Sequence, residues 1–191
     1  MEPLYIILAI IAFLIIGIVL IYNGLVAKRQ RCNQAFADID VQLKQRRNLI
    51  PNLVETVKGY AAHEQETFQQ VIDARNASQA ASGVAAQAQA ESQLAGALGR
   101  LFALAEAYPD LKANTNFLEL QRELSVIEDK LAAARRFYNS AVGDYNTARE
   151  QFPASLIAGP FGFEPREFFD VGEGERELLS VVPEVSFSKE T

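Results

Sequence analysis

The chain has 191 residues, a formal net charge of −6 and an isoelectric point of about 4.9. This acidic balance argues against a nucleic-acid-binding protein, whose surface needs an excess of Lys and Arg. The length fits one domain, or one domain with a membrane anchor. The single cysteine, Cys32, cannot form an intrachain disulfide, which suits a reducing compartment.

The first element is an apolar segment without charges from Leu4 to Ile21. At about 1.5 Å per residue it would span roughly 27 Å, close to the ~30 Å hydrocarbon core of a bilayer. We therefore expect residues 1–22 to form a transmembrane anchor. A cleaved signal peptide and a buried core helix are the alternatives. No Lys or Arg precedes the segment, no small-residue cleavage site follows it, and core helices are rarely apolar on every face.

The charges beside this segment predict its orientation. Lys28, Arg29 and Arg31 follow it, whereas Glu2 is the only charge before it. Because basic flanks stay in the cytoplasm, we expect the N-terminus outside and the remaining domain in the cytoplasm, with the reverse orientation as the alternative.

The next element is an amphipathic helix with apolar residues at alternating steps of three and four. We expect one helix from about residue 4 to residue 48, ended by Pro51, which cannot continue a helix interior. Arg29 and Arg46 fill gaps in its apolar stripe, which consists of Leu25, Cys32, Phe36, Ile39, Leu43 and Ile50.

A second helix is predicted from Pro51 to about Arg75, with Glu64 inside its apolar stripe. Residues 76–93 are rich in Ala, Gln and Ser, and we expect a flexible hairpin connection flanked by helical extensions, with a break at Gly83. A third helix should begin near Leu94 and end before Pro109.

A fourth helix should begin at Asn114 or Thr115 and end near residues 152–153. Its predicted apolar stripe consists of Phe117, Leu120, Leu124, Ile127, Leu131, Ala134, Tyr138, Val142 and Tyr145. Together these elements predict an all-α fold, in which the transmembrane helix continues into an antiparallel four-helix up-down bundle. We expect an irregular aromatic tail, with Phe161, Phe163, Phe168 and Phe169, to pack on this bundle within residues 23–171. Residues 172–191 are expected to form a mobile acidic tail.

Several stretches of the chain match one protein family. Residues 39–64 read IDVQLKQRRNLIPNLVETVKGYAAHE, and they are the most specific of these stretches. Shorter matches follow at Val71, Ala74–Arg75, Leu120–Gln121, Glu123–Leu124, Glu128, Ala134–Arg135, Tyr138–Asn139, Val142, Tyr145–Asn146, Gly162–Phe163 and Phe168–Phe169. Over residues 22 to about 170 the chain resembles the LemA family. It departs from the family at Phe36, around which a tryptophan is common, but phenylalanine keeps the packing role.

The resemblance implies a membrane-tethered antiparallel helical bundle in a bacterial inner membrane, with no established reaction. It also implies a relation to chains linked with magnetosome membranes or encoded beside membrane metalloproteases.

The residues themselves predict no catalytic, cofactor-binding or metal-ligating site. His63–Glu64 would need a second histidine at position 67 to form a zinc-binding HExxH motif, but Thr67 is there. No sequence motif pairs a catalytic nucleophile with a general base, and no motif of a phosphate-binding loop is present. We interpret His63 as a surface or interface residue and Cys32 as a small apolar filler. For Glu64, an ion pair that fixes the register, a ligand contact and exposure at the edge of the stripe remain open.

A repeat of Tyr-Asn at a seven-residue spacing marks the fourth helix. Tyr138 and Tyr145 share one helix face, and Asn139 and Asn146 share the adjacent face. This pattern fits either a core with polar positions or a stripe that binds a partner.

These features favour a non-enzymatic, membrane-anchored scaffold or adaptor that binds proteins. The expected partners are the lipid bilayer, further copies of the chain or another membrane protein, with neither nucleic acid nor a small-molecule substrate. Membrane organisation is the alternative, and a signal-transmitting sensor is a third, weaker hypothesis.

Overall fold

The computed structural model describes residues 2–170, most of which are helical, without strands in that range. Its elements are α1 (Glu2–Lys58), α2 (Gln65–Ala80), α3 (Val84–Glu106), α4 (Pro109–Lys112), α5 (Thr115–Glu150) and α6 (Ser155–Ala158). The all-α prediction is confirmed. The predicted acidic tail of residues 172–191 lies outside the described residues.

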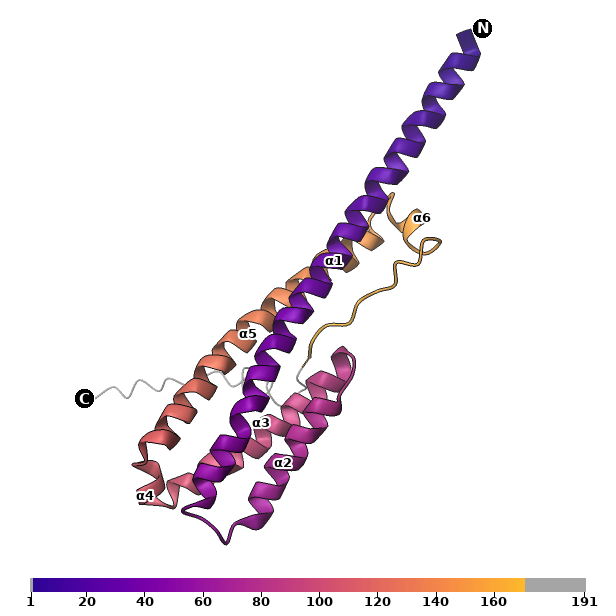
Figure 1. Cartoon of the computed structure of the whole chain (residues 1–191). Helices are drawn as coiled ribbons and strands as arrows, with labels where there is room; N and C mark the ends of the chain where they lie inside the picture. Colours follow the sequence, from indigo (N-terminus) through magenta and orange to yellow (C-terminus); the bar gives the residue numbers. More distant parts are fainter. Residues whose placement is uncertain (1, 171–191) are drawn as a thin grey trace, which may run out of the picture.

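The four long helices run alternately in opposite directions (Figure 1). The most extensive contacts join α1 to α5 and α2 to α3. The α2–α3 hairpin covers the end of the α1–α5 pair that is farther from the N-terminus, and α6 lies at the other end (Figure 1). After α6 the chain turns back and runs along this pair as an extended segment.

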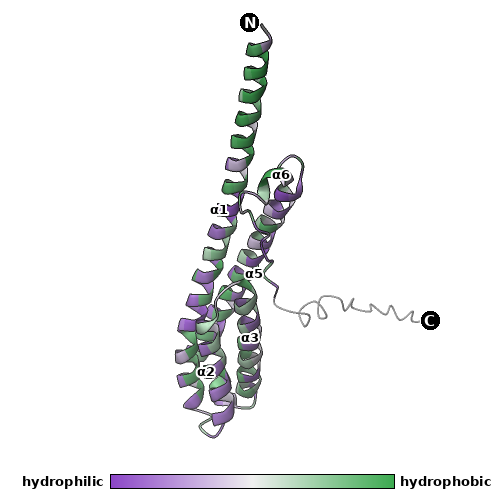
Figure 2. Ribbon diagram, turned by 90° about the vertical axis from the view of Figure 1, so that its right-hand side faces the viewer, coloured by the Kyte–Doolittle hydropathy of each residue, from purple (hydrophilic) through white to green (hydrophobic). Residues whose placement is uncertain are grey.

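The N-terminal third of α1 projects alone from the body. Residues 3–20 are exposed apart from half-buried Gly17, although almost all of them are apolar. Figure 2 shows this stretch as a continuous hydrophobic rod. Within residues 2–170 it is the one helical stretch long and apolar enough to cross a membrane. Contact with the body begins at Ile21 and Leu25.

The prediction that Pro51 ends the first helix is wrong, because α1 continues through Pro51 to Lys58. A proline inside a helix leaves the carbonyl four residues earlier without its N–H donor. Here that carbonyl belongs to Arg47, and the Nε of Arg75 on α2 donates to it at 3.0 Å. Burial of Ile50, Leu53 and Val54 on either side of the proline also holds the helix together.

The second helix consequently begins later than predicted, at Gln65, after the turn of residues 59–64. The expected break at Gly83 is confirmed: its φ of +86° is a conformation that glycine adopts without strain. The helical extensions on either side are longer than expected, since α2 reaches Ala80 and α3 begins at Val84 rather than near Leu94. The expected cap of the fourth helix is also correct, since Asn114 Oδ1 accepts from the N–H of Phe117 at 3.0 Å.

The core consists of two hydrophobic clusters along the α1–α5 pair. One includes Leu25, Cys32, Ile39, Leu43, Tyr138, Val142 and Tyr145, and it is completed by Phe163 and Phe169 of the tail. The other includes Ile50, Leu53, Val57, Phe68, Leu94, Leu98, Leu101 and Leu124 from α1, α2, α3 and α5. Of the four phenylalanines expected to pack on the bundle, Phe163 and Phe169 are buried in this cluster, whereas Phe161 and Phe168 are exposed. The chain after α6 covers the part of the pair that the α2–α3 hairpin leaves open.

Candidate functional site

The site with the most specific geometry is a set of four side chains on α5 that holds the segment of residues 163–170. We call Tyr138, Asn139, Tyr145 and Asn146 the clamp, and residues 163–170 the tail segment. Asn146 Nδ2 donates to the carbonyl of Arg166 at 2.9 Å, and its Oδ1 accepts from the N–H of the same residue at 2.9 Å. Asn139 makes the same pair of bonds with Phe169, at 3.1 and 2.8 Å.

The two tyrosines also bind carbonyl groups of the tail segment that are three residues apart. Tyr145 donates its hydroxyl to the carbonyl of Glu164, and Tyr138 donates to that of Glu167, both at 2.9 Å. Arg149 Nε continues the row by donating to the carbonyl of Phe163 at 3.0 Å. The tail segment thus runs antiparallel to α5.

The seven-residue repeat on α5 matches a three-residue repeat on the tail segment. Seven helical residues rise about 10.5 Å, and three extended residues span about 10 Å. Each Tyr-Asn pair therefore meets an equivalent stretch of main chain. Because an asparagine amide carries both a donor and an acceptor, it can bind both polar groups of one peptide residue. The hydrogen bonds of the clamp therefore all go to main-chain groups of the tail segment.

The side chains of the tail segment add the contacts that depend on sequence. Phe163 and Phe169 are buried, whereas Phe168 is exposed. The guanidinium of Arg29 lies 5.1 Å from the ring centroid of Phe163, and Arg166 donates to Asn33 Oδ1 on α1 at 2.8 Å. The segment therefore connects α1 to α5.

Burial raises the pKa of both clamp tyrosines above the ordinary value, and the nearby Arg166 opposes this effect. Both hydroxyls consequently stay protonated donors at neutral pH. Burial also raises the pKa of the Cys32 thiol, which donates to the carbonyl of Ala141 at 3.3 Å. This environment fits the predicted role of Cys32 as a filler rather than that of a reactive thiolate.

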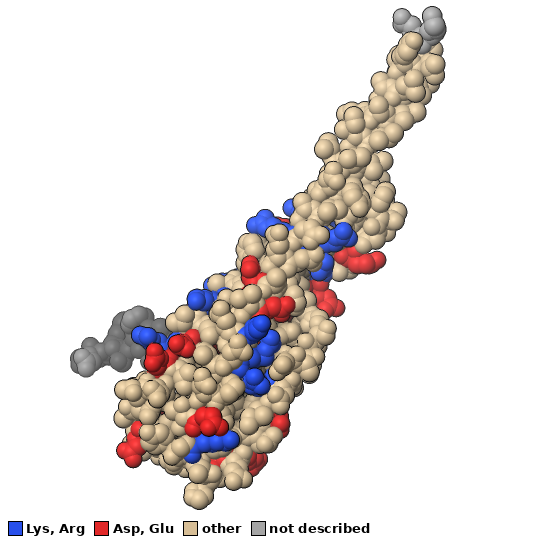
Figure 3. All heavy atoms as spheres, viewed as in Figure 1, with Lys and Arg blue, Asp and Glu red and all other residues tan. Residues whose placement is uncertain are grey.

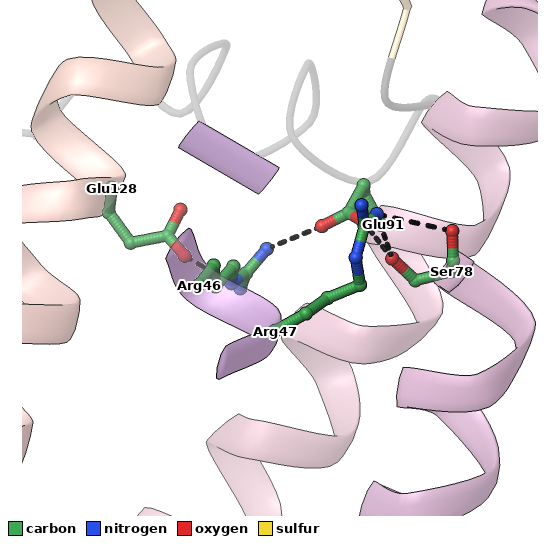
Figure 4. Close-up of polar contacts among 5 residues, drawn as sticks. All are labelled: Arg46, Arg47, Ser78, Glu91 and Glu128. Atoms are coloured by element: carbon green, nitrogen blue, oxygen red, sulfur yellow. Dashed lines mark hydrogen bonds and ion pairs between the residues drawn. The ribbon is translucent and has the colours of Figure 1, made fainter. Parts of the chain in front are cut away.

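A second polar cluster separates the two hydrophobic clusters. It comprises Arg46, Arg47, Ser78, Glu91 and Glu128, and we call it the polar layer (Figure 4). Arg46 Nη1 lies 3.0 Å from Glu91 Oε2, and its Nη2 lies 2.6 Å from Glu128 Oε1. The hydroxyl of Ser78 donates to Glu91, and Arg47 donates to the same hydroxyl at 3.2 Å.

The polar layer joins all four long helices, and Arg46, Ser78 and Glu91 are buried in it. Such a buried charge pair contributes little net stability, but breaking it is costly. We interpret the layer as a device that sets the relative position of α1, α2, α3 and α5. Sequence reasoning noted Arg46 as a gap in the stripe but missed Glu91. The available signal was the position of Glu91 in the apolar stripe of α3 with Leu94, Leu98 and Leu101.

The other candidate residues from the sequence belong to neither the clamp nor the polar layer. His63 is exposed, as expected for a surface residue. Glu64 is not inside the stripe of the second helix, because that helix starts one residue later. Its carboxylate accepts from the Tyr108 hydroxyl at 3.5 Å, and no Lys or Arg among residues 2–170 forms an ion pair with it.

Within the described residues, no group of three or more His, Cys, Asp or Glu side chains could hold a metal ion. An open groove between α1 and α5 is lined by Gln45, Asn48, Leu49, Arg122, Glu123, Val126, Ile127 and Lys130. This lining contains no Ser, Cys or His that could act as a nucleophile or as its base.

Comparison with known proteins identifies the family. Magnetosome protein MamQ of Magnetospirillum gryphiswaldense is 26% identical over 85% of this chain and 69% of its own length. Protein LemA of Metamycoplasma hominis is 26% identical over 81% of this chain and 71% of its own length. The sequence model of the LemA family matches residues 35–187, which include the clamp, the tail segment and Arg46. This match covers well over half of the chain, which therefore belongs to the LemA family.

Proposed function

We propose that the protein is a membrane-anchored, non-enzymatic scaffold that binds proteins, with self-association through the clamp as its main mode. The observation that carries this proposal is the double recognition of main-chain groups by Asn139 and Asn146. Such a site fits any extended segment of suitable spacing, including the tail segment of a second copy. Exchange of the tail segment between two copies would use the same contacts, so the interface needs no new surface.

The proposed anchor is the apolar part of α1, which would confine the copies to one membrane. Confinement in two dimensions raises their effective concentration for one another, and so favours exchange relative to the same chains free in solution. By the positions of Lys28, Arg29 and Arg31, the N-terminus would lie outside and the body in the cytoplasm of a bacterial inner membrane.

A complementation experiment tests the exchange. One chain carries Asn139→Ala and Asn146→Ala, so that its clamp is defective and its tail is intact. The other carries Phe163→Ala and Phe169→Ala, so that its tail is defective and its clamp is intact. The two chains, with different tags, are reconstituted together into lipid bilayers and then extracted. We expect co-purification of the mixed pair, and much less of either variant with itself.

The matched control replaces the clamp variant by Asn116→Ala, an exposed asparagine on α5 outside the clamp. This chain should associate like the wild type. A wild-type particle of one chain at micromolar concentration, with no mixed pair recovered, would refute self-association through the clamp.

Membrane organisation is the second candidate, because three basic side chains follow the apolar segment and could bind anionic lipid. Two of them also pack on the body: Arg29 on Phe163 and Arg31 on Phe137, with guanidinium carbons 5.1 and 5.4 Å from the ring centroids. Since only Lys28 of the three lacks such a ring contact, we rank this function below the scaffold.

A further inference from the structure

Three large apolar side chains are exposed around α6, at the opposite end of the body from the α2–α3 hairpin. The exposed fractions are 81% for Phe152, 68% for Leu156 and 54% for Phe161. They belong to residues 151–162, which we call the α6 corner. Isolated apolar side chains on a surface are common, but a group of three this exposed on twelve residues marks a contact surface.

The α6 corner lies beside the point where the apolar part of α1 leaves the body (Figures 1 and 2). The ring of Phe161 packs edge-on against that of Tyr22, with centroids 5.5 Å apart. Tyr22 directly follows the uncharged stretch that ends at Ile21. An anchor of this length places Tyr22 at the boundary of the hydrocarbon core, where tyrosine is favoured. Phe161 must then lie at the same depth.

The distribution of charge agrees with this depth. No residue from Gln151 to Phe163 is charged. Charged side chains of both signs border this stretch: Glu150 and Glu164 flank it, Arg149 donates to the carbonyl of Phe163, and Arg29 lies over the ring of Phe163. In Figure 3, charged side chains of both signs lie where α1 enters the body, and the surface shown beyond them is uncharged. Apolar groups followed by charged groups match the order of acyl chains and polar headgroups at a bilayer surface.

We propose that the α6 corner is a second membrane-contact site, which inserts Phe152, Leu156 and Phe161 into the boundary between headgroups and acyl chains. The inference rests on the anchoring part of the proposed function, but on neither its orientation nor self-association. A single helix leaves the body free to tilt and rotate on the membrane. A second contact beside it fixes one face of α5 and the tail segment toward the lipid, and so sets the direction in which the clamp is presented.

Single-tryptophan reporters test the insertion, since the chain contains no tryptophan. The full chain carries Phe161→Trp or Leu156→Trp and is reconstituted into nanodiscs of ordinary or brominated phospholipid. Bromine quenches tryptophan only at close range. We expect blue-shifted emission from both variants, with stronger quenching by bromine near the headgroup than by bromine at the chain end.

Two references separate this inference from the proposed anchor. Tyr22→Trp should be quenched if the anchor spans the bilayer, and failure of this variant to join the nanodisc would refute the anchor itself. Leu118→Trp, exposed at the far end of α5, should be red-shifted and unquenched.

Quenching of Tyr22→Trp without quenching at positions 156 and 161 would overturn the second contact while the anchor stands. Blue-shifted but unquenched reporters at these positions would also overturn it, because a protein surface rather than lipid would then cover the corner.

Discussion

Removing the asparagines of the clamp should release the tail segment locally without unfolding the helices. Asn139 and Asn146 each make two hydrogen bonds to the main chain of the tail segment, at 2.8–3.1 Å. At about 1 kcal/mol per bond, and with one main-chain residue left partly unpaired, each Asn→Ala change should cost about 2–3 kcal/mol. The free energy of local opening should fall by this amount.

Amide hydrogen exchange measures this opening directly, because the N–H groups of Arg166 and Phe169 are the donors to the two asparagines. Each variant should accelerate exchange over residues 163–170 by roughly 30- to 150-fold, since about 1.4 kcal/mol corresponds to tenfold. The double variant should accelerate it by less than the product, because a detached segment has no further contacts to lose.

Peptides from α2 and α3 should keep their wild-type exchange rates, and Asn116→Ala should leave the whole chain unchanged. Wild-type exchange over residues 163–170 in the double variant would refute the reasoning, because side-chain burial alone would then hold the segment.

Three other predictions follow from the polar layer, from the buried phenylalanines of the tail and from the charges beside the apolar segment. Arg46→Ala or Glu91→Ala should each lower the free energy of unfolding by about 3–5 kcal/mol, whereas replacing both with Leu should cost less; similar losses in all three thermal melts would contradict a buried charge pair. Truncation after Gly172 should leave the melting temperature nearly unchanged. Truncation before Phe161 should lower it clearly, because each buried phenylalanine of the tail contributes about 1.5–3 kcal/mol; equal melting of both would show that the tail adds no stability. A cysteine introduced at Ala80 should react with an impermeant maleimide only after cells are permeabilised, and labelling of intact cells would reverse the proposed orientation.

The features that depend on local chemistry could be predicted from the sequence. The uncharged segment after Leu4, the stripe of α5, the cap at Asn114 and the break at Gly83 each depend on residues within a few turns of one another. The sequence also predicted that the two tyrosines of the Tyr-Asn repeat share one helix face and the two asparagines the adjacent one, because seven residues make two helical turns.

What occupies that face depended on tertiary structure. Whether Asn139 and Asn146 meet water, a partner or the chain's own tail segment depends on a turn near α6 that brings residues some 20–30 positions away back onto α5. The polar layer is non-local in the same way, because Arg46 and Glu91 are 45 residues apart. The sequence around either residue does not indicate which residue it pairs with.

Pro51 shows most clearly the difference between what the local sequence predicts and what the tertiary structure decides. Local chemistry predicts the end of a helix there, because proline removes a hydrogen bond from the Arg47 carbonyl. The bond that replaces it comes from Arg75, 28 residues away on α2. Sequence determined that this carbonyl would need a donor, and only the packing of α2 against α1 decided that a side chain would supply one and let the helix continue.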